Sequence, residues 1–282
     1  MTLQRIITIS RYRFWVYELG PFAYGVFAGA ASLVSLLDIR VFVFALFFLF
    51  SANLYIYGIN DMFDYETDLQ NPRKVEYEAL VRPEEWNTLW IWIICSVVPF
   101  LLFLPLRNTG AILSMFAFLF FAGFYSAKPI RAKARPFFDS VFSAGHYVAT
   151  GAFGYYLVGG VGFPLLPLLA GMSWAIAMHA YSAVPDISAD SGAGLKTIAT
   201  MFGKKYTILL CLALYALSAI LTFQYFGVVS LVLGLVYVSL MLVSLRTKTD
   251  EALLKLYTYF PYLNGFAGMI IFFTILRYTN YW

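Results

Sequence analysis

The sequence predicts an all-α, polytopic membrane protein with nine transmembrane helices. Three observations predict this fold: 61% of the 282 residues are hydrophobic, only 12% are charged, and long uncharged runs recur along the chain. A soluble domain carries about 25% charged residues. Because the apolar runs account for most of the chain, we expect one domain over residues 1–282 and no separate soluble domain.

Nine runs are suitable for crossing a bilayer, since a membrane helix needs roughly 20 apolar residues. In chain order they cover residues 14–37, 41–60, 87–106, 109–127, 137–158, 164–184, 206–226, 228–245 and 258–276. The first run lacks a small-residue cleavage site and is longer than the apolar region of a signal peptide, so we expect a span. Cys95 and Cys211 fall inside spans and match no disulfide or metal spacing, which favours core packing for both.

The basic residues predict the orientation of the chain. With the N-terminus inside, 16 of the 19 lysines and arginines fall on the inner face. The exceptions are Arg40, Arg107 and Arg277. Short loops rich in Lys and Arg stay cytoplasmic. We therefore expect a protein of the cell (inner) membrane with its N-terminus in the cytoplasm and its C-terminus outside. The net charge of +4 then reflects topology, and no nucleic-acid partner is predicted.

A first acidic cluster, NDMFDYETDLQNPRK at residues 60–74, directly follows an uncharged run. If the helix of the second span continues past Asn60, then Asn60, Asp61, Asp64 and Asp68 fall within an arc of about 100°. Carboxylate and amide oxygens gathered on one helical face suit Mg²⁺, which proteins hold by a few carboxylates together with substrate phosphates. The alternative is a solvated loop that is merely acidic.

A second acidic cluster lies at the end of the sixth span, in HAYSAVPDISADSGAGLKTIATMFGKK at residues 179–205. Asp186 and Asp190 are four residues apart and share a helical face, while Pro185, Gly192 and Gly194 indicate a broken helix and a loop. GAGLKT lacks the spacing of a P-loop, so no nucleotide site is predicted. If the two acidic helices face each other, their carboxylates would hold metal ions that bridge one diphosphate and stabilise its departure.

A basic segment, YSAKPIRAKARPFFD at residues 125–139, lies between the fourth and fifth spans. Arginine and lysine bind diphosphate oxygens that metal ions leave free, although a purely topogenic role is the alternative. The candidates are Lys128, Arg131, Lys133 and Arg135, and the basic residues behind the acidic motifs, Arg73, Lys74 and Lys196. Tyr125 and Tyr181 end matching helices and could line the reaction site. For Glu18 and Asp139, the two acids inside spans, structural and functional roles are both open.

Three motifs resemble the UbiA superfamily of intramembrane prenyltransferases: NDMFDYETD with NPRK behind it, YSAKPIRAKARP, and DISAD followed by Gly194, Thr197 and Gly203. They arrive in the family's order and spacing, and the span layout covers the whole chain. The resemblance implies a helical bundle around a central cavity open laterally to lipid. It also implies a cytoplasmic polar cap, formed by the loops after the second and sixth spans, with the active site near that face.

The resemblance also implies roles for individual residues. The implied ligands of Mg²⁺ and diphosphate are Asn60, Asp61, Asp64, Asp68, Asp186 and Asp190. Which of Lys128, Arg131 and Lys133 contacts the diphosphate stays open. We predict Asp64, Asp190, Tyr125 and Tyr181 as catalytic residues, and structural roles for His146 and His179.

Within the superfamily, HAYSAVPDISADSGAGLKTIAT and NDMFDYETDLQNPRK are similar to the lycopene elongases, the branch that prenylates carotenoids. This similarity implies Mg²⁺-dependent transfer from an allylic prenyl diphosphate to a lipophilic acceptor such as lycopene. The alternatives are an aromatic acceptor in quinone biosynthesis and, from another class, a cation transporter. Transporter acids lie near the midplane of the bilayer, whereas these are expected at its rim. Donor chain length, hydroxylation of the product and oligomeric state are not predicted.

Overall fold

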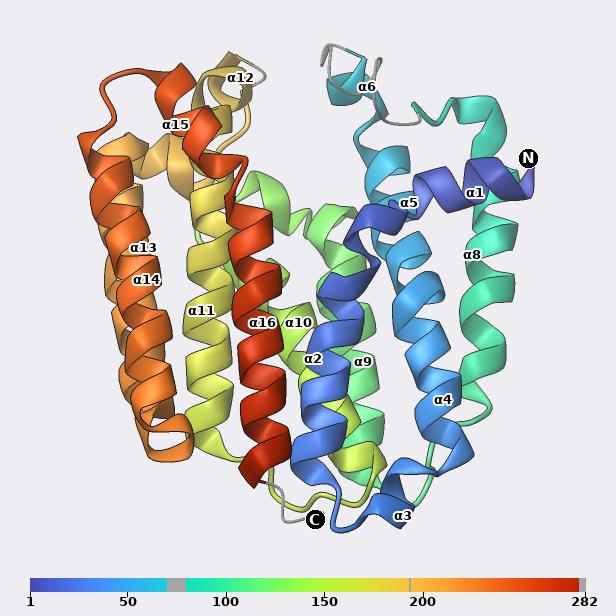
Figure 1. Ribbon diagram of the computed structural model, residues 1–282. Helices are drawn as coiled ribbons and strands as arrows, with labels where there is room; N and C mark the ends of the chain where they lie inside the picture. The colour runs from blue at the N-terminus through green and yellow to red at the C-terminus, as the bar shows by residue number, and fades with distance from the viewer. Residues whose placement is uncertain (70–79, 193, 279–282) are drawn as a thin grey trace. The chain divides into compact units, whose positions relative to one another are not determined.

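The computed structural model describes residues 1–69, 80–192 and 194–278, and the regular elements in these ranges are all helical (Figure 1). The all-α prediction is confirmed for this part of the chain. The chain divides into two compact units, which are described separately. Unit 1 comprises Met1–Arg131 and Ala149–Val161, and unit 2 comprises Ala132–Val148 and Gly162–Trp282.

Unit 1 is built around a long helical run near the centre of its sequence. Its elements are α1 (Leu3–Ile9), η1 (Tyr12–Phe14), α2 (Trp15–Gly29), α3 (Leu33–Leu36), α4 (Ile39–Leu46), η2 (Phe47–Ser51), α5 (Ala52–Phe63), α6 (Tyr65–Asp68), η3 (Pro83–Glu85), α8 (Trp86–Leu101), α9 (Thr109–Ser126) and the last part of α10 (Phe138–Leu157). The α4–η2–α5 run extends without a break over Ile39–Phe63. α5 packs against α8 and α9.

The middle of that run, η2, is π-helical and is stabilised by Asn53. A π-turn displaces backbone carbonyls from their usual partners. The Asn53 amide donates to the carbonyls of Phe48 and Leu49 at 3.0 and 3.1 Å. Asn53 therefore has a structural role in shaping the helix that leads to the first acidic cluster.

Buried phenylalanines form the core of unit 1. Phe44 meets Phe153 with ring centroids 4.6 Å apart, and Phe48 meets Phe22 at 5.1 Å and Phe118 at 5.4 Å. Each such pair contributes about 0.5–1.5 kcal/mol beyond the burial of its area. Because these rings come from α2, α4, η2, α9 and α10, they fix the helices that carry the site.

The two acids predicted inside spans both have structural partners. Glu18 is buried in α2 and accepts a hydrogen bond from the Thr150 hydroxyl at 3.0 Å, within unit 1. Asp139 is buried in unit 2, where its carboxylate accepts from the backbone N–H groups of Ser140 at 2.7 Å and Ile198 at 2.8 Å. Ile198 begins α13, so Asp139 stabilises the N-terminus of that helix.

Unit 2 is a helical unit in which α13 packs against both α11 and α14. Its elements are η4 (Ala132–Ala134), the first part of α10, α11 (Leu165–Ala183), η5 (Val184–Asp186), α12 (Ile187–Gly192), α13 (Ile198–Phe226), α14 (Val228–Arg246), α15 (Asp250–Tyr257) and α16 (Phe260–Tyr278). Gly203, with φ 71° and ψ 171°, interrupts α13 near its start. That backbone conformation is open to glycine and strained for other residues.

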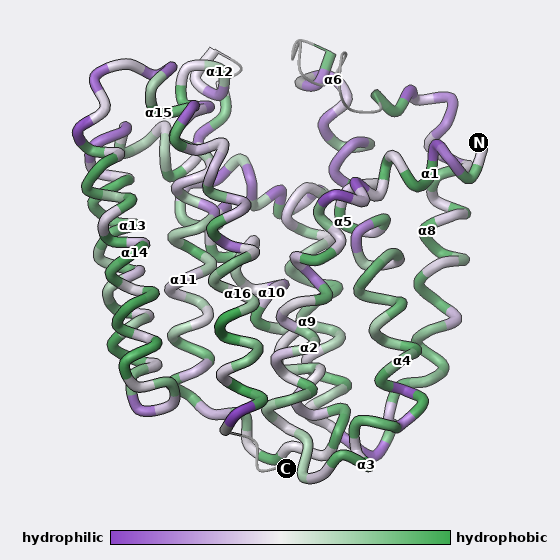
Figure 2. Tube along the Cα trace, viewed as in Figure 1, coloured by the Kyte–Doolittle hydropathy of each residue, from purple (hydrophilic) through white to green (hydrophobic). Residues whose placement is uncertain are grey.

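Six helical segments in the described residues are long and apolar enough to cross a membrane. They are Ile39–Phe63, Thr109–Ser126, Leu165–Gly192, Ile198–Phe226, Val228–Arg246 and Asp250–Arg277. The other three predicted spans coincide with α2, α8 and α10. α2 and α8 have only 15 and 16 residues and contain Pro21 and Pro99. Figure 2 shows the apolar residues along the middle of α4, α8, α13 and α14.

Candidate functional site

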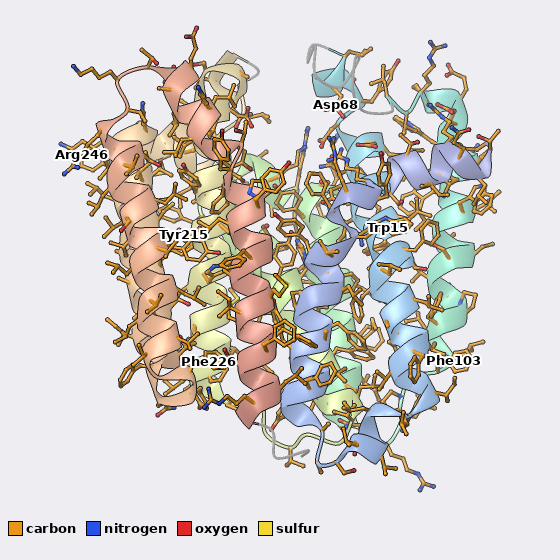
Figure 3. All side chains as sticks on the ribbon, in the orientation of Figure 1. Trp15, Asp68, Phe103, Tyr215, Phe226 and Arg246 are labelled. Carbon is orange, nitrogen blue, oxygen red and sulfur yellow. The ribbon has the colours of Figure 1, made fainter. Side chains whose placement is uncertain are left out.

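The first acidic cluster keeps helical spacing beyond the end of α5. The Asp64 N–H donates to the Asn60 carbonyl at 3.0 Å, and the Asp68 N–H donates to the Asp64 carbonyl at 2.8 Å. Asn60, Asp64 and Asp68 therefore follow one another at one-turn intervals, as the helical prediction requires. Asp64 and Asp68 are buried, although α6 lies at the end of unit 1 (Figure 3). The interpretation as a solvated acidic loop does not fit this burial.

Asp61 is held by an arginine from the N-terminal segment. An Arg11 guanidinium nitrogen lies 2.8 Å from Asp61 Oδ1, and both side chains are largely buried. The same guanidinium lies 4.4 Å from the centre of the Tyr57 ring, one turn earlier on α5. Arg11 adopts the left-handed backbone conformation, with φ 52°, between α1 and η1. A strained backbone at a non-glycine residue persists only where its surroundings enforce it.

Asp64 has a looser cationic partner, Arg131, which follows α9. The closest nitrogen of Arg131 is 3.5 Å from Asp64 Oδ1, at the limit of a hydrogen bond. Arg131 Nε is buried and has no hydrogen-bond partner within the described part of the chain. An unsatisfied buried donor costs about 1–3 kcal/mol, more for a charged group. The guanidinium therefore has a donor left over for an anionic oxygen beside Asp64.

Asn60 links the same two segments. Its side-chain amide donates to the Ser126 hydroxyl at 2.9 Å, at the last residue of α9. α5 and α9 approach closely one turn earlier, because a Cβ on Gly123 would lie 2.4 Å from the Tyr55 hydroxyl oxygen. Unit 1 thus brings the first acidic cluster together with the beginning of the basic segment.

The second acidic cluster lies in unit 2, on a broken helix as predicted. α11 ends at Ala183, η5 carries Asp186 with Pro185 in its first turn, and α12 carries Asp190. Asp190 interacts electrostatically with Asp186, Lys133 and Asp139. The structure therefore brings the second acidic cluster together with Lys133 of the basic segment, all within unit 2.

The remaining predicted residues have different environments. Tyr125 is half-buried in the last turn of α9, whereas Lys128 and Lys196 are exposed. Tyr181 is fully buried, its hydroxyl lies 2.9 Å from that of Ser244, and its ring contacts Phe260. The catalytic role of Tyr181 stays a prediction. Arg73 and Lys74 lie outside the described residues.

Sequence reasoning missed Arg11 and Ser126, which contact the first cluster in unit 1, and Tyr57, whose ring contacts Arg11. Arg11 stands in the run RYR, where its charge was counted only toward topology. Ser126 is inside the quoted motif YSAKP but carries no charge, and Tyr57 is one of 21 tyrosines. The sequence held a signal for Tyr57 alone: it lies four residues before Asp61, which places both on one face of the helix.

The described residues contain no group of three or more His, Cys, Asp and Glu side chains that could hold a metal ion. A Mg²⁺ ion bound through one or two carboxylates and the phosphates of its substrate needs no such group. Asn60, Asp64 and Asp68 supply hard oxygen ligands of the required kind.

The sequence profile of the UbiA prenyltransferase family matches residues 19–277. The chain belongs to this family. It is 35% identical over 271 residues to the lycopene elongase/hydratase of Haloferax volcanii, a match covering 94% of this chain and 86% of that relative. It is 32% identical over 230 residues to the lycopene elongase/hydratase of Corynebacterium glutamicum, covering 78% and 76%.

Solved structures share the fold of this UbiA chain. A UbiA homolog from Archaeoglobus fulgidus bound to GPP and Mg²⁺ matches with a TM-score of 0.70 and 20% sequence identity, covering 98% of this chain and 99% of that one. A UbiA homolog from Aeropyrum pernix matches with a TM-score of 0.68 and 19% identity, covering 93% and 98%. Family membership and the six long apolar helices make this chain a multi-pass membrane prenyltransferase.

Proposed function

We propose that the chain transfers a prenyl group from an allylic prenyl diphosphate to lycopene or a similar carotenoid. The observation that carries the proposal is the pairing of Asp64 with Arg131, whose Nε has no hydrogen-bond partner in the described residues. It joins a carboxylate of the first acidic motif to a phosphate-binding side chain. The lycopene elongase/hydratases that are 35% identical to this chain support the choice of acceptor.

The diphosphate is bound by the basic residues near the two acidic motifs. Arg131 is the strongest candidate of the basic segment because it adjoins Asp64, and Lys133 takes the equivalent part beside Asp190 in unit 2. Arg73, Lys74, Lys128 and Lys196 remain proposed ligands from the sequence. Arginine and lysine both form charge-assisted hydrogen bonds to phosphate oxygens.

Mg²⁺ is the proposed cofactor. Its proposed ligands are Asn60, Asp61, Asp64, Asp68, Asp186 and Asp190. The metal supplies positive charge against the departing diphosphate. Since UbiA homologs have been solved with Mg²⁺ and with GPP or DMAPP, metal dependence fits the fold.

The reaction is an electrophilic alkylation. The C–O bond of the donor breaks and the diphosphate leaves with the electron pair, so its developing charge is stabilised by the side chains that bind it. A double bond of the acceptor attacks the prenyl carbon and a new C–C bond forms. Loss of a proton or capture of water then neutralises the acceptor cation. Aromatic side chains can stabilise both cations through their π faces.

The proposal retains the predicted membrane arrangement of a single UbiA-like domain. Nine spans surround a cavity open to lipid, with the N-terminus in the cytoplasm, the C-terminus outside and a polar cap on the cytoplasmic face. Under this proposal α2, α8 and α10 are the three spans beyond the six long ones. The charge distribution supports this orientation.

Expression in a lycopene-producing host tests the choice of acceptor. We expect lycopene to be converted to carotenoids that are heavier by one or two prenyl groups, measured by mass spectrometry of the extracted pigment. A host expressing Asp64→Asn should retain lycopene. Unchanged lycopene with the wild-type protein present in the membrane would contradict the carotenoid acceptor and favour an aromatic one.

A further inference from the structure

A pocket lies at the end of unit 1 that is remote from the acidic cluster. It has a volume of about 510 Å³ and is lined by the turn before α4, the loop between α8 and α9, and residues at and after the end of α10. Pockets for small ligands have volumes of roughly 300–1,000 Å³. Arg40 lines the pocket at the start of the 25-residue run Ile39–Phe63, whereas Asn60 lies near its other end. A helix of that length spans roughly 37 Å, and α3 and α6 lie at opposite ends of unit 1 (Figure 1).

The charges lining this pocket leave one positive charge uncompensated. Arg40 Nε lies 3.0 Å from each carboxylate oxygen of Asp38, so these two side chains neutralise each other. That pairing holds the pKa of Asp38 below its usual value, and the carboxylate stays charged at neutral pH. Arg107 lines the same pocket, is exposed, and has no ion-pair partner in the described part of the chain. The pocket is therefore complementary to an anion.

The loop that carries Arg107 is fixed in place. Asn108 donates to the Tyr156 carbonyl at 2.6 Å and accepts from the Ala111 N–H at 3.1 Å. Asn108 is thereby the N-cap of α9, an 18-residue helix. The backbone that carries Arg107 is therefore already ordered before binding, and the planar donors of a guanidinium match the geometry of a phosphate.

Exposed apolar side chains adjoin the charged groups. Leu106 lines the pocket next to Arg107 and is 80% exposed, and Leu37 beside Asp38 is 71% exposed. In a membrane protein such leucines contact lipid acyl chains. A phosphate site beside an apolar surface matches the chemistry of a phospholipid, which has a phosphate head group and apolar acyl chains.

The sequence adds an independent reason to expect a function here. Arg40 and Arg107 are two of only three basic residues that the charge pattern assigns to the outer face. Arginine is avoided in outward-facing short loops. Two of the three exceptions nevertheless line one pocket, from positions 67 residues apart in the sequence.

We propose that the pocket lined by Arg40, Arg107 and Asn108 binds the phosphate of an anionic phospholipid. Arg107 supplies the charge, the Arg40–Asp38 pair forms a polar wall, and the acyl chains lie on the neighbouring leucines. The site is separate from the prenyl diphosphate site and does not depend on the proposed function.

Thermal unfolding of the full-length protein in zwitterionic detergent tests this site. Phosphatidylglycerol, phosphatidylcholine or inorganic phosphate is titrated into wild-type protein and three variants. Arg107→Gln removes the charge, Ser35→Phe narrows the pocket without changing charge, and Arg277→Gln removes the third outer-face arginine, which does not line the pocket. Size-exclusion profiles establish that each variant is folded.

We expect phosphatidylglycerol to raise the unfolding temperature saturably and phosphatidylcholine to have little effect. Arg107→Gln should weaken the apparent affinity about tenfold or more, the effect of losing one charge-assisted hydrogen bond. Ser35→Phe should also weaken the apparent affinity, because the larger side chain takes up space in the pocket. Arg277→Gln should bind phosphatidylglycerol with the same apparent affinity as the wild-type protein. If inorganic phosphate competes with phosphatidylglycerol, the phosphate alone is recognised. If inorganic phosphate does not compete, the lipid tails are needed for binding. Wild-type affinity in both pocket variants, or equal weakening by Arg277→Gln, would overturn the proposal.

Discussion

Asp61 and Asp64 are three residues apart on one helix, yet their cationic partners differ in kind. Asp61 forms a close pair with Arg11 at 2.8 Å, whereas Asp64 lies 3.5 Å from Arg131. The charge of Asp61 is already compensated, and Arg131 retains a buried donor without a partner in the described residues. Asp64 therefore lies beside a cationic donor that could bind a diphosphate oxygen.

The Arg11–Asp61 pair predicts strong coupling in stability. Removing one member takes from the other its partner at 2.8 Å, and breaking a buried pair costs roughly 3–5 kcal/mol. We expect Asp61→Asn and Arg11→Gln each to destabilise the protein by about that amount, and the double variant to cost less than their sum. Chemical unfolding in detergent micelles measures these free energies. Glu66→Gln, at an exposed acid on α6, is the matched control and should change stability by under about 0.5 kcal/mol. Additive costs would show that the pair is not coupled.

The residues of the acidic cluster could be predicted, but their partners could not. Asn60, Asp64 and Asp68 follow from the period of a helix, which is a local property of the sequence. Arg11 and Ser126 are 50 and 66 residues away from their partners Asp61 and Asn60. Only the packing of α1 and α9 against α5 brings them near, and no local pattern encodes it.

Among the elements, α2 and the last part of α10 cross at unusually short range. A Cβ on Gly25 would lie 1.9 Å from the backbone oxygen of Gly151, and one on Gly154 would lie 2.3 Å from that of Phe22. Small residues allow membrane helices to approach this closely. The crossing also brings Glu18 to Thr150 and Phe22 near Phe153.

Gly25→Ala should therefore destabilise unit 1, because the new methyl group meets backbone that must move. Overpacking of this kind costs about 1–3 kcal/mol. Gly20→Ala in the same helix is the control, since a Cβ there meets nothing within 4 Å and should be neutral or slightly stabilising. The unfolding temperature in detergent distinguishes them. Equal unfolding temperatures for the two variants would show that α2 and α10 do not maintain this close contact.

The contact between α1 and the start of α8 should depend on pH. Arg5 donates two hydrogen bonds of 2.6 Å to the Glu85 carboxylate, and this contact lowers the pKa of Glu85. A carboxylate with a lowered pKa stabilises the fold above its unfolded pKa of about 4.3, and that stabilisation is lost as the pH falls through the folded value.

We therefore expect α1 to open more often as the pH falls below about 4.3. Hydrogen–deuterium exchange of residues 3–9, corrected for intrinsic rates, measures this opening. In the Glu85→Gln variant, α1 should open readily at neutral pH, and the rate of its opening should change little as the pH falls. If wild type and Glu85→Gln show the same pH profile, the ion pair does not hold α1.

The positions of the helices could be predicted better than their interruptions. Each of the nine predicted spans overlaps a described helix, because apolar length is written directly in the sequence. The first, predicted over 14–37, is interrupted, since α2 ends at Gly29 and α3 begins at Leu33. The π-helical segment Phe47–Ser51 was not predicted, since it lies inside a uniformly apolar run. The break at Gly203 was also missed, because glycine alone does not distinguish an interruption from close packing.

For the whole molecule, composition and charge were the most informative features of the sequence. The low charge content predicts a membrane protein, and the six long apolar helices with membership of the UbiA family agree. The two acidic motifs belong to different units, so their joint action on one diphosphate stays a prediction. It depends on the assembly of the whole chain, which no short sequence pattern describes.

Prenyl transfer in isolated membranes tests the function most directly. Membranes containing the wild-type protein, Asp64→Asn or Glu66→Gln are incubated with labelled dimethylallyl diphosphate and lycopene, with Mg²⁺ or with a chelator. We predict labelled, heavier carotenoid only when Mg²⁺ is present, at equal rates for wild type and Glu66→Gln. Asp64→Asn should be slower by about 100-fold or more, because it removes a proposed ligand of the Mg²⁺ that stabilises transition-state charge. Transfer without Mg²⁺, or full activity in Asp64→Asn, would contradict the proposed site.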